Sequence, residues 1–214
     1  MADRLRLFIA IEVPPPVLSA LAMLIEGLRR TDAGGLRPVR PEGIHLTLRF
    51  LGSVDRQRVQ DIMDAVAAAA GAISPLAVQL GRPGVFPRRG PPRVLWVGLD
   101  GQVEALTELQ ATVEKSLSSI GFPEGRQPFH PHLTVARLRD GTPAADRQAA
   151  AEAFLEYDVP PDLRVHVQHL SLIQSALRPG GAIYSRLAHM PLRSPPAERT
   201  RGSASIAPAS GPEI

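Results

Sequence analysis

The chain of 214 residues contains no cysteine and only one lysine, Lys115, and aromatic residues make up 4% of it. Without cysteine, disulfides, a thiol nucleophile and every zinc site built on thiolates are excluded. No apolar run approaches the roughly 20 residues that a membrane-spanning helix requires. The first residues show no signal-peptide pattern. We therefore expect a cytoplasmic protein that does not enter a membrane.

Charge alone does not assign a function. The chain has 24 basic and 21 acidic residues, and all but one of the basic residues are arginine. A guanidinium binds two phosphate oxygens at once, so arginine is suited to phosphate recognition. A composition rich in arginine, alanine, proline and glycine is also typical of GC-rich coding, so both interpretations stay open. With 44% hydrophobic residues, the chain is long enough to bury a sizeable core.

The hydrophobic pattern predicts both strands and helices. Alternating aliphatic residues indicate strands, and apolar residues at helical spacing indicate helices. From residue 193 on there are few large aliphatic residues, so residues 193–214 are expected to form a disordered tail. A loop rich in proline, glycine and arginine is expected over 82–93, and a hairpin turn over 178–181. Strands are expected over 5–11, 44–51, 76–80, 94–99, 132–138, 164–174 and 183–189, and helices over 17–28, 102–120, 146–155 and from Ser53 or Asp55 through Val66.

One short pattern occurs twice, as His45-Leu-Thr-Leu48 and as His132-Leu-Thr-Val135. Each copy lies in a strand-like segment, where side chains alternate between two faces. Histidine and threonine then share one face, and the aliphatic residues point into a core. A single His-x-Thr favours a structural histidine, but core packing does not require the repeat of both polar residues, so the pair favours function.

These residue types suit phosphodiester chemistry. Imidazole titrates near pH 6.5, so one histidine can accept a proton while the other donates one. Each acid or base typically contributes about 10²- to 10⁴-fold to the rate. Threonine hydroxyls can bind phosphate oxygens. Metal ligation is not favoured, because neither motif contains an acidic residue and the chain has no cysteine and no HExxH sequence.

Beyond the paired motifs, the sequence resembles the 2H phosphoesterases, specifically the RNA 2′,3′-cyclic phosphodiesterases once described as 2′-5′ RNA ligases. The resemblance spans about residues 4–192. It implies an α+β fold in one bilobal domain, residues 1–192, with two pseudo-symmetric lobes of antiparallel sheet and outer helices around a central cleft. The matching segments are RLFIAI (6–11), RPEGIHLTLRFLG (40–52), FPRR (86–89), PRVLW (92–96), FHPHLTVAR (129–137) and GGAIY (180–184).

The resemblance also implies roles for individual residues. His45 would be the proton donor to the departing ribose oxygen, and His132 the proton acceptor that activates water. The reaction would open a 2′,3′-cyclic phosphate at an RNA end to a 2′-phosphomonoester without a metal or cofactor. Its reverse would make a 2′-5′ linkage. Phosphate would be bound by Thr47, Thr134 and Arg137, and a nucleobase would stack on Phe50.

Two of these positions conflict with simple alternation. Phe50 and Arg137 each lie an odd number of residues from their histidine, so an ideal strand turns them away from it. Arg49 would share the face of His45. Either the strands bulge or end at these positions, or Arg49 is itself a phosphate ligand. Arg88 and Arg89, in the proline-rich loop, are candidates for contact with an RNA backbone.

The expected partner is therefore RNA with a 2′,3′-cyclic phosphate end, and we expect the protein to be a monomer. Two alternatives remain from the sequence. One is a related phosphodiesterase that acts on a small cyclic nucleotide or an ADP-ribose cyclic phosphate. The other is a non-catalytic module that binds RNA ends, against which the retention of both His-x-Thr pairs argues.

Overall fold

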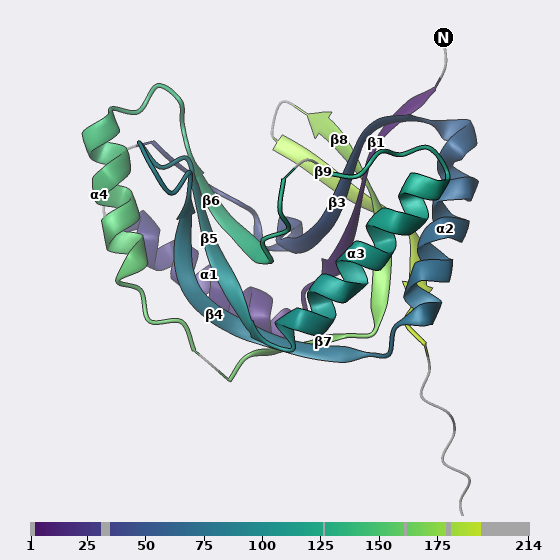
Figure 1. The fold of residues 1–214 in the computed structure, drawn as a ribbon. Helices are drawn as coiled ribbons and strands as arrows, with labels where there is room; N and C mark the ends of the chain where they lie inside the picture. Colours follow the sequence, from purple (N-terminus) through teal and green to yellow (C-terminus); the bar gives the residue numbers. More distant parts are fainter. Residues whose placement is uncertain (1–2, 31–34, 126, 161, 179–180, 194–214) are drawn as a thin grey trace, which may run out of the picture.

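The computed structural model describes residues 3–30, 35–125, 127–160, 162–178 and 181–193. In these residues strands and helices alternate along most of the chain (Figure 1). The strands are β1 (Arg4–Glu12), β2 (Leu36–Pro38), β3 (His45–Asp55), β4 (Leu76–Phe86), β5 (Val94–Gly101), β6 (His132–Leu138), β7 (Arg164–Val167), β8 (His169–Arg178) and β9 (Gly181–Pro191). The helices are α1 (Pro15–Arg29), α2 (Val59–Ala72), α3 (Val103–Ser119) and α4 (Ala144–Leu155), with 3₁₀ turns at Pro41–Gly43 and Arg56–Arg58.

The strands of the described residues form one curled antiparallel sheet in the order β7-β4-β5-β6-β3-β1-β8-β9, and β2 pairs with β6. Figure 1 shows two arms, one with β3, β1, β8 and β9 and the other with β6, β5 and β4. A single register pair, Leu46 opposite Leu133, joins β3 to β6. The α+β antiparallel fold predicted from the sequence is confirmed.

Helices cover the outer face of each arm. α1 and α4 pack against the arm of β4 and β6, while α2 and α3 pack against the arm of β3, β8 and β9. α1 follows β1 and α3 follows β5, so each of these helices crosses from one arm to the other. The two arms are therefore interlinked, because each is covered in part by a helix that follows a strand of the other arm.

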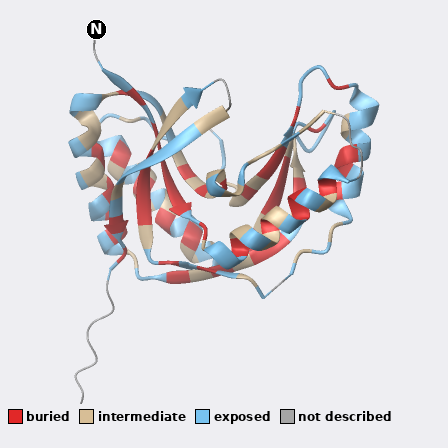
Figure 2. Cartoon of the chain, turned by 180° about the vertical axis from the view of Figure 1, so that it is seen from behind, coloured by how far each residue is buried: buried red, intermediate tan, exposed pale blue. Residues whose placement is uncertain are grey.

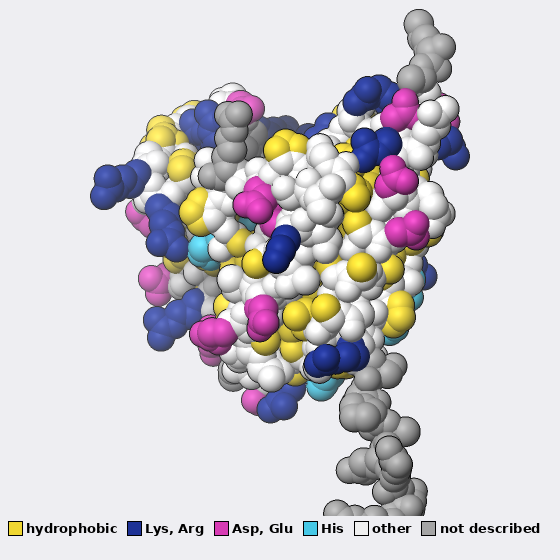
Figure 3. Space-filling view, turned by 45° about the vertical axis from the view of Figure 1, so that its right-hand side comes forward, with side chains coloured by type: hydrophobic (Ala, Val, Ile, Leu, Met, Phe, Trp, Pro, Cys, Tyr) yellow, Lys and Arg dark blue, Asp and Glu magenta, His cyan; other side chains and the backbone are white. Residues whose placement is uncertain are grey.

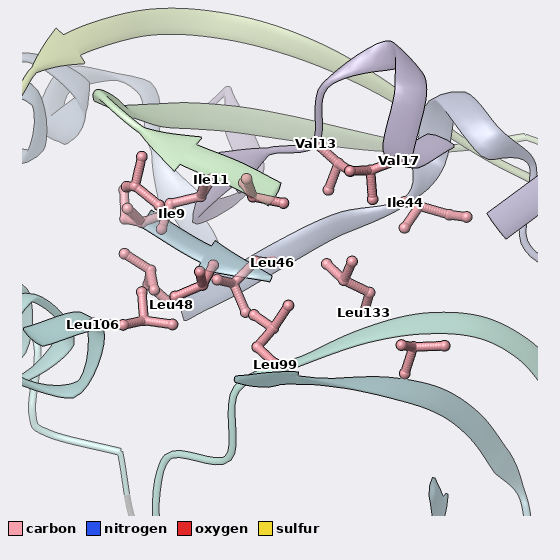
Figure 4. Close-up of a cluster of buried hydrophobic side chains, with 14 of the residues drawn as sticks. Ile9, Ile11, Val13, Val17, Ile44, Leu46, Leu48, Leu99, Leu106 and Leu133 are labelled. Carbon is pink, nitrogen blue, oxygen red and sulfur yellow. The ribbon is translucent and has the colours of Figure 1, made fainter. Parts of the chain in front are cut away.

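The core lies between the sheet and these helices, where buried positions face one another (Figure 2). Leu46 and Leu133, which directly follow the two histidines, are 2% and 0% exposed and point into one apolar cluster (Figure 4). Burying each such side chain stabilises the fold by about 1.5–3 kcal/mol. The prediction that the aliphatic residues of both motifs point into the core is confirmed. Core packing thus fixes which face of each strand the histidine occupies.

Several predicted boundaries differ from the structure. β4 continues to Phe86, so the loop predicted over 82–93 shortens to 87–93 and Arg82 lies in a strand. The reason is a register shift between Leu80 and Pro83, where an irregularity in the pairing with β5 accommodates the proline. The strand predicted over 164–174 is divided into β7 and β8. The short strand β2 was not predicted.

The structure also shows where two of the predicted segments begin. Asp55, not Ser53, caps the turn before α2, because its carboxylate accepts a hydrogen bond from the Gln57 amide at 3.0 Å. Arg193, assigned from the sequence to the tail, donates its backbone N–H to Ile73. The rest of the predicted tail, 194–214, and residues 179–180 of the predicted turn lie outside the described residues. The limits of the bilobal domain stay a prediction.

Candidate active site

A bulge in β3 follows the first motif. β1 pairs Ala10 with Thr47 but Ile9 with Arg49, so one residue of β3 is skipped between them. Directly opposed residues of antiparallel strands point to the same face. Thr47 therefore shares a face with Ala10, whereas Arg49 shares one with the core residue Ile9. Phe50, opposite Phe8, returns to the face of Thr47.

The second motif has the same irregularity at the same place. β5 pairs Trp96 with Thr134 and Leu95 with Ala136, so Val135 is skipped. Arg137 then lies opposite Val94 and returns to the face of Thr134. Phe50 and Arg137 are thus equivalent positions of the two arms, each five residues after its histidine. Of the alternatives that the sequence left open, the structure shows the bulge.

His45 lies against aromatic rings on the concave face. Its imidazole stacks on Phe8 with ring centroids 4.6 Å apart and meets the edge of Tyr184 at 5.2 Å. Burial lowers the pKa of His45 from 6.5 to about 4, although a hydrogen bond to Gly43 and the charge of Glu12 oppose this by raising it. The nearby His132 lowers it further. At neutral pH His45 is therefore neutral in the absence of substrate.

His132 is held in a defined tautomer. Its Nδ1 lies 2.6 Å from the carbonyl oxygen of His130, and because a carbonyl only accepts, Nδ1 carries the proton. The lone pair of the neutral ring is then on Nε2. Phe86 and Trp96 surround the imidazole, with ring centroids 5.1 and 5.9 Å away.

Burial is also the main reason that the pKa of His132 is lowered. The carbonyl of His130 raises this pKa, while the charges of His130 and Arg137 lower it. A neutral imidazole with a fixed free lone pair is the form that a general base requires. The arrangement at His132 therefore suits proton acceptance without any rearrangement of the ring.

The antiparallel pairing at Leu46 and Leu133 brings the two motifs together with opposite directions. This sense of pairing directs His45 toward the end of the motif that carries Thr134, and Thr47 toward His132. The charge of His132 lowers the pKa of His45, which also indicates that the two histidines lie near each other. Both threonines are half-buried. A phosphate bound between the motifs would therefore meet one imidazole and one hydroxyl from each arm.

The structure turns Arg49 away from the concave face and does not favour its interpretation as a phosphate ligand. Its guanidinium lies 3.3 Å from the Glu114 carboxylate of α3 and donates to the backbone carbonyl of Pro123. Both side chains of the ion pair are largely buried, with 15% and 13% exposed. The bulge after Thr47 is the cause, because it turns Arg49 toward the helices.

The other predicted arginines lie on the second arm. Arg137 is exposed and close enough to lower the pKa of His132. Arg88, at the start of the loop after β4, lies with its Nη2 3.1 Å from Nε2 of His130. Arg89 is exposed in the same loop. In the part of the chain that the structure describes, no three His, Asp or Glu side chains come together as candidate metal ligands.

Glu12 is a site residue that the sequence argument missed. It ends β1 directly opposite His45, and its carboxylate lies 2.6 Å from a guanidinium nitrogen of Arg186 on β9. A cavity of about 240 Å³ opens beside His45 and is lined by Glu12, Arg186 and Tyr184 among others. Alternation along 5–11, extended by one residue to an acidic side chain, is the signal that places Glu12 on the concave face.

The fold and the paired His-x-Thr strands together define the class of the 2H phosphoesterases. The chain belongs to the 2′-5′ RNA ligase superfamily, whose family model matches residues 14–178. It is 32% identical over 186 residues to the RNA 2′,3′-cyclic phosphodiesterase of Archaeoglobus fulgidus, a match that covers 86% of this chain and 98% of the relative. The resemblance stated from the sequence is confirmed.

Solved structures agree with this family. The protein TT0787 of Thermus thermophilus superposes with a TM-score of 0.66 at 30% identity, over 88% of this chain and 98% of that one. E. coli LigT complexed with 3′-AMP superposes with a TM-score of 0.65 at 25% identity, over 90% of this chain and 100% of that one. Among the described residues, none of the helices has both the length and the apolar character to cross a membrane.

Proposed function

We propose that this protein is an RNA 2′,3′-cyclic phosphodiesterase that opens the cyclic phosphate at an RNA end to a 2′-phosphomonoester. The observation that carries the proposal is the pair of bulged His-x-Thr strands, joined at Leu46 and Leu133. Curated relatives from several archaea and bacteria are named for this activity. A solved neighbour, E. coli LigT, carries a nucleotide, 3′-AMP.

The proposed reaction uses two proton transfers. Nε2 of His132 accepts a proton from water as the water oxygen attacks phosphorus. The bond from phosphorus to the ribose 3′ oxygen breaks, and that oxygen takes a proton from His45. The products are a 2′-phosphomonoester and a 3′ hydroxyl, so one water is consumed and the proton count balances. Thr47, Thr134 and Arg137 bind the phosphate oxygens.

This scheme requires a protonated His45, and the negative charge of the substrate favours that form. Without bound substrate, burial lowers the pKa of His45 to about 4. A phosphodiester anion in contact with the imidazole raises this pKa, because a nearby negative charge favours the imidazolium. Glu12 acts in the same direction. His45 thus takes up a proton when the substrate binds. His132 stays neutral because burial, and to a smaller extent the charge of Arg137, lowers its pKa.

Product analysis tests the proposal. An RNA ending in a 2′,3′-cyclic phosphate, incubated with the protein and excess EDTA, should give only the 2′-phosphate. Loss of activity on chelation would contradict the metal-free scheme, and a 3′-phosphate product would contradict the assigned leaving group. A 5′-hydroxyl RNA added to the same reaction reports whether the reverse ligation to a 2′-5′ linkage occurs.

Substrate class is tested by the same assay. If a mononucleoside or ADP-ribose cyclic phosphate is opened with a higher kcat/KM than an oligonucleotide end, the natural substrate is a small molecule. If RNA ends bind but no cyclic phosphate is opened, the protein is a binding module.

A further inference from the structure

Two arginines face each other beside the proposed phosphate site. β2 pairs with β6 so that Arg37 lies directly opposite Arg137, while their neighbours Leu36 and Leu138 form the adjacent pair. Side chains of directly opposed residues share a face and have Cβ atoms about 5 Å apart. Since Arg137 lies on the concave face with Thr134, Arg37 lies there too.

Neither guanidinium has a carboxylate partner among the described residues, and both side chains are exposed. Opposed like charges destabilise a strand pair unless an anion lies between them or next to them. Some other exposed arginines have a carboxylate partner. Arg93 pairs with Asp140 and Arg186 with Glu12, and Figure 3 shows basic and acidic side chains interspersed on the face turned forward.

Arg37 does not lie where a second ligand to the reacting phosphate would be expected. β2 contacts β6 only over 136–138, beyond Thr134 and away from His132. The register pair of Leu133 with β3 lies nearer the histidine. Along β6 the order is therefore His132, Thr134 and Arg137, with Arg37 beside the last of these. Arg37 extends the cationic surface away from the reacting phosphate.

We infer that Arg37, beside Arg137, binds the phosphate on the 5′ side of the terminal nucleotide and so favours RNA ends over nucleosides. The inference rests on the proposed function, because it takes the reacting phosphate to lie between the two His-x-Thr motifs. A planar guanidinium can hold this second phosphate by two parallel hydrogen bonds. The short strand β2 thereby gains a role in substrate selection.

Two substrates that differ by one phosphate isolate this contact. A nucleoside 2′,3′-cyclic phosphate has no 5′ phosphate, whereas its 5′-phosphorylated form carries the group that Arg37 would bind. The wild-type protein should open the 5′-phosphorylated form with a kcat/KM about tenfold higher, the gain expected of one charged hydrogen-bonded contact. In Arg37→Gln this ratio should fall to about one, whatever happens to the absolute rates.

Arg29→Gln is the matched control, because it removes the same charge from the outer helix α1, where Arg29 pairs with Glu26. It should keep the wild-type ratio. On an oligonucleotide end, Arg37→Gln should also lower the dependence of log kcat/KM on log salt concentration by about 0.7, the share of one phosphate contact on a single strand.

The outcomes separate the inference from the proposed function. A wild-type ratio near one, or an unchanged ratio in Arg37→Gln, overturns the inference while the hydrolysis itself stands. If neither substrate is opened, the proposed function fails, and equilibrium binding of nucleoside 2′-phosphate and 2′,5′-bisphosphate then makes the same comparison without turnover. Equal binding of the two by the wild-type protein overturns the inference in that case as well.

Discussion

The two arms carry the same motif and the same bulge, but different neighbours surround their histidines. Opposite His45 on β1 is the acidic Glu12, whereas opposite His132 on β5 is Gly98. Five residues after the histidine, one arm has Phe50 and the other Arg137. A carboxylate stabilises an imidazolium and a guanidinium destabilises one. The proposed proton donor and the proposed acceptor therefore differ in their neighbours, since the motif is common to both.

Replacing either histidine should have the largest effect, and the two replacements should change the pH profile in different ways. His45→Asn and His132→Asn should each lower kcat by about 10²- to 10⁴-fold. Activity needs a protonated donor and a neutral acceptor, so residual activity of His45→Asn should lose its alkaline limb and that of His132→Asn its acidic limb. The pH profile of kcat measures this. Exchanged limbs would reverse the two roles.

The two arginines that follow the motifs should separate binding from stability. Arg137→Gln should lower kcat/KM by roughly 10- to 150-fold, because it removes charged hydrogen bonds to phosphate worth about 1.5–3 kcal/mol. Arg49→Gln should instead leave Glu114 largely buried without its partner and destabilise the fold by about 3 kcal/mol. Urea unfolding and steady-state kinetics on both variants check this.

The opposite pattern for these two arginines would restore Arg49 as a phosphate ligand. That result would require β3 to pair with β1 without the skipped residue between Thr47 and Arg49. Arg56→Gln is the control for the loss of charge, because its guanidinium also pairs with a carboxylate, that of Asp3, but at an exposed site. Its unfolding free energy should change by less than about 1 kcal/mol.

Phe50 and Phe8 are neighbours on the concave face, with ring centroids 5.7 Å apart, but only Phe50 is exposed, at 64% against 2%. Phe50→Ala should weaken binding of a base by about 1–3 kcal/mol through lost stacking and leave the unfolding free energy unchanged. Phe8→Ala should cost about 3–5 kcal/mol of stability. Phe50→Leu tests stacking itself, since a raised KM is expected there too; a normal KM would indicate simple apolar contact.

The sequence was enough to predict most of the fold and the strand face that carries both His-x-Thr pairs, for a physical reason. Alternation is a local property, so Leu46 and Leu133 identify the buried face and thereby the opposite face of both histidines. The repeat of His and Thr then marks that face as polar in both halves. A predicted strand boundary was wrong where a proline lies at an irregularity in the strand pairing, as at Pro83.

Other features depend on pairing between distant strands and could not be predicted. The skipped residues after Thr47 and Thr134 are defined only by registers with β1 and β5. A one-residue irregularity exchanges the faces of all later side chains, which is why Arg49 was misassigned. The register with β6 likewise defines the position of Arg37, and the register with β3 places Glu12 directly opposite His45, although alternation alone indicates the face of Glu12.

Replacing Glu12 should have the smallest effect, and it tests most directly how the surroundings of the two histidines differ. Its charge raises the pKa of His45, so Glu12→Gln lowers that pKa and His45 loses its proton at a lower pH. The alkaline limb of the kcat profile should move down by up to about one pH unit, which is at most about tenfold in rate above the limb. The acidic limb, set by His132, should not move.

Glu42→Gln provides the matched control for this prediction. Glu42 lines the same cavity beside His45, but it is not among the charges that shift the pKa of His45. Its profile should therefore coincide with that of the wild-type protein. If both variants move the alkaline limb equally, the total negative charge around His45, and not one carboxylate, determines which histidine is the proton donor. If only Glu12→Gln moves it, the carboxylate directly opposite His45 makes this histidine the acid of the pair.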